Sequence, residues 1–336
     1  MPQRQIPSTG SRGQLNDSIS SFLQQFPDLH LGGQEDFHDE RRKHLNAFGI
    51  HSLPSDRVHP IHDVEFTAIR GPHGTIPIRV LYPSSGEAYR ASNKAAGLIY
   101  FHGGGYTIGS VDEFENGLRL LAEASGVQIY AVEYRLSPEF RFPVQLDEYD
   151  AVIDALQGET GKARGVQTVL GGGDSAGGNM TAAIALRRKD DGKKPLDALV
   201  LLYPEARVPF DTPAAVENNS GYYLECNGIF SFADHYLPRG IPPSHRYVSP
   251  GMQGTDNLSD LSPAFVYTSG FDPLRDVGVE YACKLQKAGN QVVWRHYDDM
   301  THGWLQMTAW SQTAQAAVKD VARDIKSLVY GHNSLT

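Results

Sequence analysis

The stretch from residue 168 to residue 181 constrains the fold of this chain more than any other part of it. It reads TVLGGGDSAGGNMT and joins a short apolar run to a segment that can form a helix. Gly173, Ser175 and Gly177 fill the pattern G-x-S-x-G, in which serine sits on a sharp turn between a strand and a helix. The flanking glycines let strand and helix pass closely, and the first N–H groups of the helix can bind a carbonyl oxygen. The pattern therefore predicts an outward-facing serine nucleophile.

A dinucleotide-binding turn is the main alternative for the same glycines. Gly171, Gly173 and Ala176 also satisfy the spacing G-x-G-x-x-[GA], and Asp191 lies 20 residues after Gly171 (191 − 171 = 20). In dinucleotide folds, however, this turn follows the first strand and the acidic residue ends the second strand. Here the turn lies in the middle of the chain, and Asp191 belongs to the polar run KDDGKK. The context therefore favours the serine turn.

The composition limits the classes of partner. The chain has 336 residues, of which 40% are hydrophobic and 21% charged, and its formal net charge is −9. A negative chain is unsuited to nucleic acid or to an anionic membrane surface, so a neutral or cationic small molecule is the easier partner. No apolar run approaches the ~20 residues of a membrane span. Because residues 1–13 also lack the apolar core of a signal peptide, we expect a cytoplasmic protein with reduced Cys226 and Cys283.

Strand-like and helical stretches alternate along most of the chain. The turn between the first two expected strands contains glycines and predicts a hairpin. After Tyr134 the alternation predicts an α/β fold with a mostly parallel sheet that is covered by helices on both faces. Strands are expected at residues 64–69, 76–82, 97–101, 127–134, 166–170, 198–202, 264–269 and 291–296, and helices at 145–156, 179–189, 277–288 and 313–328.

Two segments do not fit this alternation. The first is an N-terminal arm, residues 1–57, in which apolar residues recur at helical spacing. The second is an insertion, residues 205–245, which is rich in Pro, Asn, Tyr and Phe and has only weak helical periodicity. A long irregular segment inside a compact domain is usually a lid or another functional insertion. We therefore expect the main domain to consist of residues 58–204 and 246–336.

A glycine-rich loop, HGGGY at residues 102–106, follows the third expected strand. Three consecutive glycines leave the backbone free to turn its N–H groups toward a ligand, as an oxyanion hole requires. A plain glycine loop is the alternative, but turns of this type serve as oxyanion holes in lipases and esterases. The expected donors are the N–H groups of Gly103, Gly104 and Ala176, whereas His102 is expected to brace the loop.

A serine hydroxyl needs a base to remove its proton, and an acid must hold that base in place. Asp272 and His302 each come shortly after an expected strand, at the edge of an α/β sheet where ligands bind. Taken singly, Asp272 could instead be a helix cap and His302 a surface residue. The rival acids are Asp276, Asp298 and Asp299. The chain order of serine, acid and histidine favours Asp272 as the acid and His302 as the base.

Together these motifs resemble those of the hormone-sensitive-lipase branch of the α/β-hydrolases, which includes many microbial carboxylesterases. The resemblance implies an α/β-hydrolase fold with an eight-stranded sheet, a helical cap built from the arm and the insertion, and a possible homodimer. Ser137 and Trp304 stand where this family usually has alanine and phenylalanine. The matching motifs are HGGGY at 102–106, YRLSPE at 134–139, FPVQLDEYDAV at 142–152, GDSAGG at 173–178, DPLRD at 272–276 and HGW at 302–304.

The resemblance implies a serine carboxylesterase with Ser175 as nucleophile, His302 as base and Asp272 as acid. Tyr106 and Trp304 would form walls of an apolar acyl pocket under the cap, so short- to medium-chain esters should be preferred. The alternatives are an amidase, a deacetylase or a lactonase with the same three residues, or a non-catalytic receptor on the same fold. No cofactor or metal is expected, because metal-ligand spacings such as H-E-x-x-H are absent from the sequence.

Overall fold

An eight-stranded sheet forms the centre of the protein. The computed structural model describes residues 5–33, 36–208 and 210–331. The order across the sheet is β1-β2-β4-β3-β5-β6-β7-β8, with antiparallel pairs β1–β2 and β2–β4 and parallel pairs elsewhere. The predicted hairpin and the mostly parallel eight-stranded sheet are confirmed. The strands are β1 (Asp63–Gly71), β2 (Gly74–Tyr82), β3 (Ala95–Phe101), β4 (Gln128–Val132), β5 (Val166–Asp174), β6 (Ala198–Leu202), β7 (Ala264–Phe271) and β8 (Val292–Thr301).

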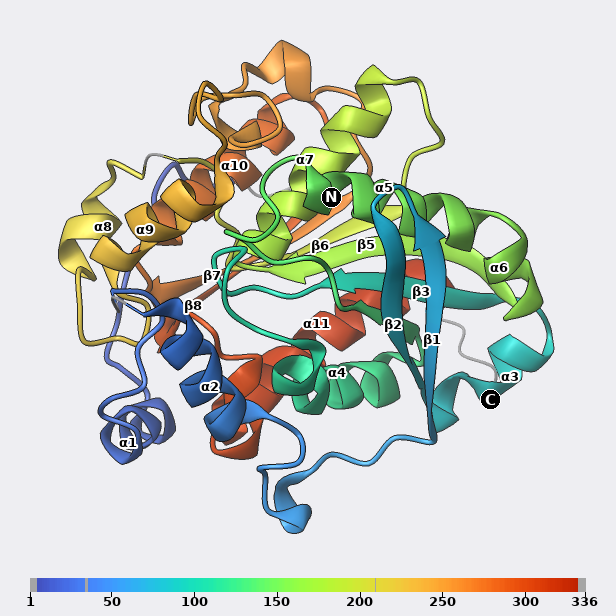
Figure 1. Ribbon diagram of the computed structural model, residues 1–336, viewed down its shortest axis with the longest axis horizontal. Helices are drawn as coiled ribbons and strands as arrows, with labels where there is room; N and C mark the ends of the chain where they lie inside the picture. The colour runs from blue at the N-terminus through green and yellow to red at the C-terminus, as the bar shows by residue number, and fades with distance from the viewer. Residues whose placement is uncertain (1–4, 34–35, 209, 332–336) are drawn as a thin grey trace.

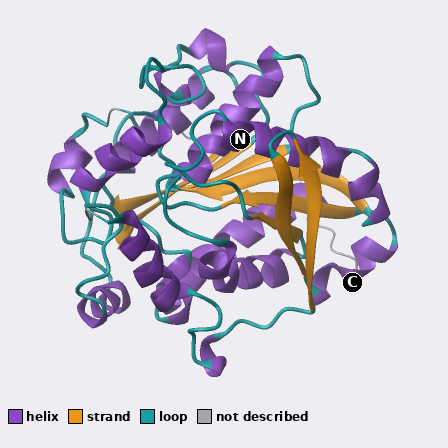
Figure 2. Cartoon of the chain, viewed as in Figure 1, coloured by secondary structure: helices purple, strands orange, loops and turns teal. Residues whose placement is uncertain are grey.

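Helices cover both faces of this sheet, as the ribbon and the cartoon show (Figure 1 and Figure 2). Crossovers between parallel strands need such helices, which explains the alternation along the sequence. On one face lie α4 (Val111–Ser125) and α11 (Gln312–Tyr330), and on the other lie α5 (Val144–Gln157), α7 (Ala176–Asp190) and α10 (Arg275–Lys287). Two short helices, α3 (Glu87–Ala91) and α6 (Glu159–Ala163), lie in connections.

The central strands are buried on both faces. In β3 all seven residues are buried. Leu98 and Tyr100 join the core beside α4 and α11, whereas Ile99 and Phe101 join the core beside α5 and α7. Successive side chains of a strand point to opposite faces, so a strand covered on both sides requires a continuous apolar run. Because of this requirement, the central strands can be predicted from the sequence.

The structure differs from the sequence prediction most clearly at α4, β5 and β8. Helix α4 is not predicted, because glutamates at the buried positions 113 and 115 interrupt its apolar pattern. Strand β5 continues through the glycines at 171–173, which pair with β3 and β6 although glycine is disfavoured in strands. Strand β8 continues through residues 297–301, most of which are polar, as the last strand of the sheet, where one neighbour suffices.

The arm and the insertion contact each other next to the ends of β7 and β8 (Figure 1). The arm forms α1 (Asp17–Gln25) and α2 (Phe37–Phe48), and the insertion forms α8 (Pro213–Glu217) and α9 (Cys226–Tyr236). Leu31 and Leu224 form an isolated β-bridge. The N–H of Leu31 donates to the carbonyl of Tyr223 at 2.8 Å, and the N–H of Glu225 donates to the carbonyl of Leu31 at 3.0 Å. Backbone pairing therefore joins two segments that are far apart in the sequence.

Aromatic packing attaches α1 to the main domain. The rings of Phe22, Phe26 and Phe48 surround Trp310, with centroid separations of 5.3, 5.5 and 5.8 Å. Such pairs add to the free energy gained by burying the rings themselves. Aromatic residues at the C-terminal ends of α1 and α2 thus fix the arm to the body.

Candidate active site

Ser175 occupies the turn between β5 and α7 that the sequence predicts. Its φ is +53° and its ψ is −120°, a conformation that residues other than glycine seldom adopt. A Cβ atom on Gly177 would overlap the carbonyl oxygen of Phe101, so only glycine lets α7 begin this close to the sheet. The N–H of Ser175 donates to the carbonyl of Leu202 at 2.9 Å and ties the turn to β6. The strained turn therefore holds Ser175 at the carboxyl edge of the sheet.

His302 and Asp272 form a buried hydrogen-bonded pair. The Nδ1–H of His302 donates to Oδ2 of Asp272 at 2.7 Å. Oδ1 of Asp272 accepts the N–H of Leu274 at 2.8 Å, so both carboxylate oxygens are held. With the proton on Nδ1, Nε2 of the neutral ring has a free lone pair, and this buried atom has no hydrogen-bond partner among the described residues. His302 and Ser175 line the same cavity, so the residues predicted as base and nucleophile lie at one site.

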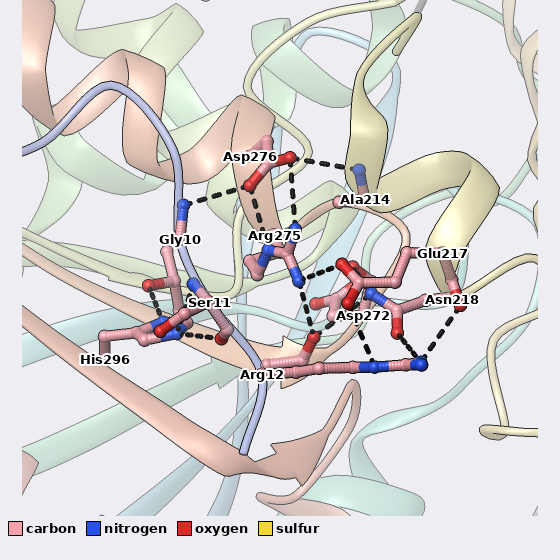
Figure 3. A network of polar contacts seen from close by, with 12 residues as sticks. Gly10, Ser11, Arg12, Ala214, Glu217, Asn218, Asp272, Arg275, Asp276 and His296 are labelled. Carbon is pink, nitrogen blue, oxygen red and sulfur yellow. Dashed lines mark hydrogen bonds and ion pairs between the residues drawn. The ribbon is translucent and has the colours of Figure 1, made fainter.

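The rival acid Asp276 is a structural anchor (Figure 3). Its Oδ1 accepts the N–H of Gly10 at 3.0 Å, and its Oδ2 accepts the N–H of Ala214 at 3.0 Å. The guanidinium of Arg275 also binds both oxygens, at 2.9 and 3.3 Å. One fully buried carboxylate therefore joins the arm, the insertion and α10, and its oxygens are already occupied by these donors.

The same network fixes the backbone around Asp272 (Figure 3). Arg12 of the arm donates to the carbonyl of Glu217 at 3.0 Å and to Oδ1 of Asn218 at 3.2 Å. The Nδ2 group of Asn218 donates to the carbonyls of Gly270 and Asp272, each at 3.1 Å. The arm and the insertion thus hold the loop that carries the carboxylate paired with His302.

The other rival acids, Asp298 and Asp299, lie within β8 and bind the arm. Their backbone carbonyls accept the N–H groups of Gly13 and Asn16 at 2.8 and 2.9 Å. Oδ2 of Asp299 also accepts the side-chain amide of Asn16 at 3.3 Å. These contacts give both residues a role in docking the arm, and His302 is held by Asp272 instead.

The backbone donors next to the serine differ in part from the prediction. The N–H of Gly103 donates to Oδ1 of Asp174 at 2.8 Å, so Gly103 is not available as an oxyanion donor, contrary to the prediction. The N–H groups of Gly104, Gly105 and Ala176 have no acceptor within the described part of the chain. Ala176 is the first residue of α7, where backbone N–H groups lack intrahelical partners. Gly104 lines the cavity and has φ of +102°, which favours glycine.

A small cavity adjoins the serine and the histidine. Leu31 and His44 line it from the arm, and Tyr223 lines it from the insertion. Residues of the arm and of the insertion therefore both reach the site. The lining also includes the polar residues Glu113 and Gln306, so this cavity is not lined by apolar side chains alone.

Tyr106 and Trp304 are not among the residues that line this cavity, although the sequence predicts them as its walls. Both are fully buried in the core. The hydroxyl of Tyr106 donates to Oε2 of Glu205 at 2.9 Å, and its ring stacks on Tyr236 at 3.7 Å. The Nε1–H of Trp304 donates to Oγ of Ser269 at 3.2 Å. Buried tyrosine and tryptophan need partners for their polar atoms, and here those partners lie within the core.

Two further buried carboxyls lie near His302. Burial raises the pKa of Asp174 to about 6, although hydrogen bonds from the Tyr100 hydroxyl and a backbone N–H oppose this rise. Burial raises the pKa of Glu205 to about 7, and the hydroxyl of Tyr106 opposes it. The charge of a protonated His302 would also lower both pKa values. Either carboxylate would therefore stabilise positive charge on this ring.

Sequence reasoning misses most of the residues that line the cavity. Asp174 could have been found, since it directly precedes the serine in the glycine pattern. Leu31, His44 and Tyr223 come from segments without a recognisable motif, and only the folded chain brings them to the site. Glu113 carries no signal either, because a glutamate on a helix is usually exposed to solvent.

The remaining expectations concern cofactors, metals and membranes. Asp191 follows the C-terminal end of α7, and the 15 residues of that helix separate it from the glycine turn by about 22 Å, which argues against a dinucleotide site. Within residues 5–33, 36–208 and 210–331, no group of three or more His, Cys, Asp or Glu side chains could hold a metal ion. None of the described helices combines the length and apolarity that crossing a membrane requires.

Comparison with known proteins decides the family. A family model described as the α/β-hydrolase fold matches residues 98–306. The carboxylic ester hydrolase LipN of Mycobacterium tuberculosis is 34% identical over 275 residues, which cover 79% of this chain and 70% of LipN. The chain belongs to the hormone-sensitive-lipase family of α/β-hydrolases.

Two further comparisons agree with this assignment. The ethyl acetate hydrolase of Pseudomonas putida is 30% identical to this α/β-hydrolase, over 87% of this chain and 92% of that enzyme. A solved structure, the hyperthermophilic esterase from the archaeon Pyrobaculum calidifontis, superimposes with a TM-score of 0.84 at 31% identity. That alignment covers 94% of this chain and 99% of the esterase. The predicted α/β-hydrolase fold is thereby confirmed.

Proposed function

We propose that this protein is a serine carboxylesterase that hydrolyses small-molecule esters through an acyl-enzyme intermediate. One arrangement carries the proposal: a hydrogen-bonded pair of His302 and Asp272 on the cavity that Ser175 lines from a strained turn. These are the nucleophile, base and acid that acyl transfer requires. Relatives named as ester hydrolases support the same reaction.

In the proposed reaction, Oγ of Ser175 attacks the ester carbonyl carbon while Nε2 of His302 takes the hydroxyl proton. The N–H groups of Gly104, Gly105 and Ala176 then donate to the oxyanion that forms. His302 gives its proton to the leaving alcohol as the ester C–O bond breaks, and the acyl group stays on Ser175. Water, deprotonated by His302, attacks the acyl carbonyl, releases the acid and restores the serine.

The role proposed for Asp272 is to keep the proton of His302 on Nδ1. Because its carboxylate accepts the hydrogen bond from Nδ1, the lone pair of His302 lies on Nε2, where it can accept the serine proton. The same carboxylate stabilises the positively charged ring that then forms. Asp174 and Glu205 add negative potential around the same ring whenever they are ionised.

We propose that the arm (1–57) and the insertion (205–245) form a cap over the main domain (58–204 and 246–336). Leu31 and Tyr223 support this division, since they line the cavity from the arm and from the insertion. The cavity that they line is small. A small site of this kind suits short acyl groups better than long ones.

A panel of esters tests the proposed function. It would compare kcat/KM for p-nitrophenyl esters from acetate to laurate with the matched anilides and with lactones. We expect the highest values for the shortest acyl groups, and much lower values for anilides and lactones. Faster turnover of anilides or lactones would instead favour an amidase, a deacetylase or a lactonase. Tight binding of a small molecule without any turnover would favour a receptor.

A further inference from the structure

Two buried polar side chains line the cavity although the proposed reaction does not use them. His44 on α2 is 1% exposed and Glu113 on α4 is 4% exposed, and both share the cavity with Ser175. Nε2 of His44 and Oε2 of Glu113 have no hydrogen-bond partner among the described residues. A buried polar atom without a partner costs free energy, so two such atoms on one cavity require an explanation.

His44 presents a hydrogen-bond acceptor to this cavity. Its Nδ1–H donates to the carbonyl of Glu40, one turn earlier on α2, at 2.9 Å. Burial lowers the pKa of His44 to about 4, so the ring is neutral at physiological pH. A neutral ring with its proton on Nδ1 has a lone pair on Nε2. The partner that Nε2 lacks must therefore be a donor.

Glu113 presents a hydrogen-bond donor. Its Oε1 accepts the hydroxyl of Ser110 at 3.0 Å. Burial raises the pKa of Glu113 to about 8; the bond from Ser110 opposes the rise, and the charges of Glu133 and Asp112 add to it. A carboxyl that stays protonated at neutral pH has one O–H to donate. With Oε1 bonded to the serine, Oε2 is the oxygen free to carry that proton.

A hydroxyl group is the smallest group that donates one hydrogen bond and accepts another. We propose that His44 and Glu113 form a hydroxyl subsite, which selects esters that carry a hydroxyl group a few atoms from the reacting carbonyl. The inference rests on the proposed esterase function and adds a substrate class to it. The small size of the cavity keeps such a hydroxyl close to Ser175.

A neutral hydroxyl suits this subsite better than an ammonium group does. Leu31, Ile108 and Phe114 line the same cavity, so a cation would lose its hydration against apolar side chains. An ammonium group could donate to His44, but it has no lone pair to accept the proton of Glu113. The hydroxyl satisfies both side chains without a change in charge.

Matched pairs of esters test the subsite in the full-length protein. One pair is the butyrate and the 3-hydroxybutyrate of the same alcohol, and the other is ethyl butyrate and 2-hydroxyethyl butyrate. In at least one pair we expect the hydroxylated ester to have a kcat/KM at least about tenfold higher, the effect of one or two added hydrogen bonds. The pair that shows the preference identifies the acyl or the alcohol side as the one bound.

Variants then assign the preference to these residues. Glu113→Leu and His44→Leu should each lower the hydroxylated-to-plain ratio of kcat/KM by about tenfold. Glu113→Gln keeps an acceptor for Ser110 and a donor for the substrate, so it should keep the ratio and serves as the matched control. If a leucine variant does not fold, the alanine variant of the same residue replaces it.

Four results would overturn the inference. Equal kcat/KM within both pairs, or a preference unchanged by Glu113→Leu and His44→Leu, would exclude the subsite while leaving the esterase function intact. Faster turnover of a 3-aminobutyrate ester than of the 3-hydroxybutyrate ester would show a cation site instead. No hydrolysis of any ester would overturn the proposed function and this inference with it.

Discussion

Replacing Glu113 with glutamine should make the protein more stable, and increasingly so as the pH rises. In the unfolded chain a glutamate loses its proton near its ordinary pKa of 4.5, whereas burial holds Glu113 protonated up to about pH 8. Between these values the folded state binds more protons than the unfolded state, so stability falls as the pH rises. Below pH 4.5 both states are protonated and the carboxyl has no such effect. Glutamine does not titrate, so the variant avoids this loss.

The size of the effect follows from the two pKa values. A rise of 3.5 (8 − 4.5) corresponds to about 5 kcal/mol once the pH is well above 8, at 1.36 kcal/mol per pKa unit. At pH 8 half of the folded molecules have lost the proton, and the expected gain of Glu113→Gln is about 4 kcal/mol. At pH 5 the same arithmetic gives a gain of about 1 kcal/mol.

Urea unfolding followed by circular dichroism at pH 5 and pH 8 would measure this difference. Glu159→Gln is the matched control, because Glu159 is exposed and its pKa is lowered by the neighbouring Lys162. The control should show no gain in stability at pH 8. A gain for Glu113→Gln that is equal at both pH values, or larger at pH 5, would refute a buried, protonated Glu113.

Three further predictions concern the acid, its rival and the cap. Asp272→Asn should lower kcat by about 10⁴-fold because His302 loses its correct tautomer. A kcat equal to that of the unchanged protein would show that another carboxylate holds His302. Asp276→Asn should instead lower the free energy of unfolding by about 3 kcal/mol in urea titrations, while the folded variant keeps most of its turnover. A larger loss of kcat in Asp276→Asn than in Asp272→Asn would show that the two carboxylates have the opposite roles. Deletion of residues 1–48 should change the acyl-length preference or inactivate the enzyme, whereas a folded truncated protein with an unchanged profile would argue against the cap.

The sheet and the loops at its carboxyl edge could be predicted because each rests on a local requirement. Central parallel strands must be apolar on both faces, and the sharp turn at Ser175 needs small neighbours. Asp272 and His302 were identifiable because each follows a strand at the edge where ligands bind. The homodimer and the cytoplasmic location stay predictions, as do the domain boundaries.

The rest could not be predicted because it depends on contacts between distant segments. Gly103 fits the donor pattern, but the carboxylate of Asp174, from another strand, takes its N–H. Tyr106 and Trp304 belong to the motifs HGGGY and HGW, yet their polar atoms form hydrogen bonds within the core. Helix α4 was not predicted because Glu113 occupies a buried position where an apolar residue would be expected.

The central claim is that Ser175 is the nucleophile, and labelling with an organophosphate tests it most directly. Such a reagent phosphorylates a serine only where a base activates the hydroxyl. Peptide mapping by mass spectrometry should find a single adduct, on Ser175. The Ser175→Ala variant should remain unlabelled and lose on the order of 10⁶ in turnover while it keeps its fold. An adduct on another residue, or full ester hydrolysis by Ser175→Ala, would contradict the account.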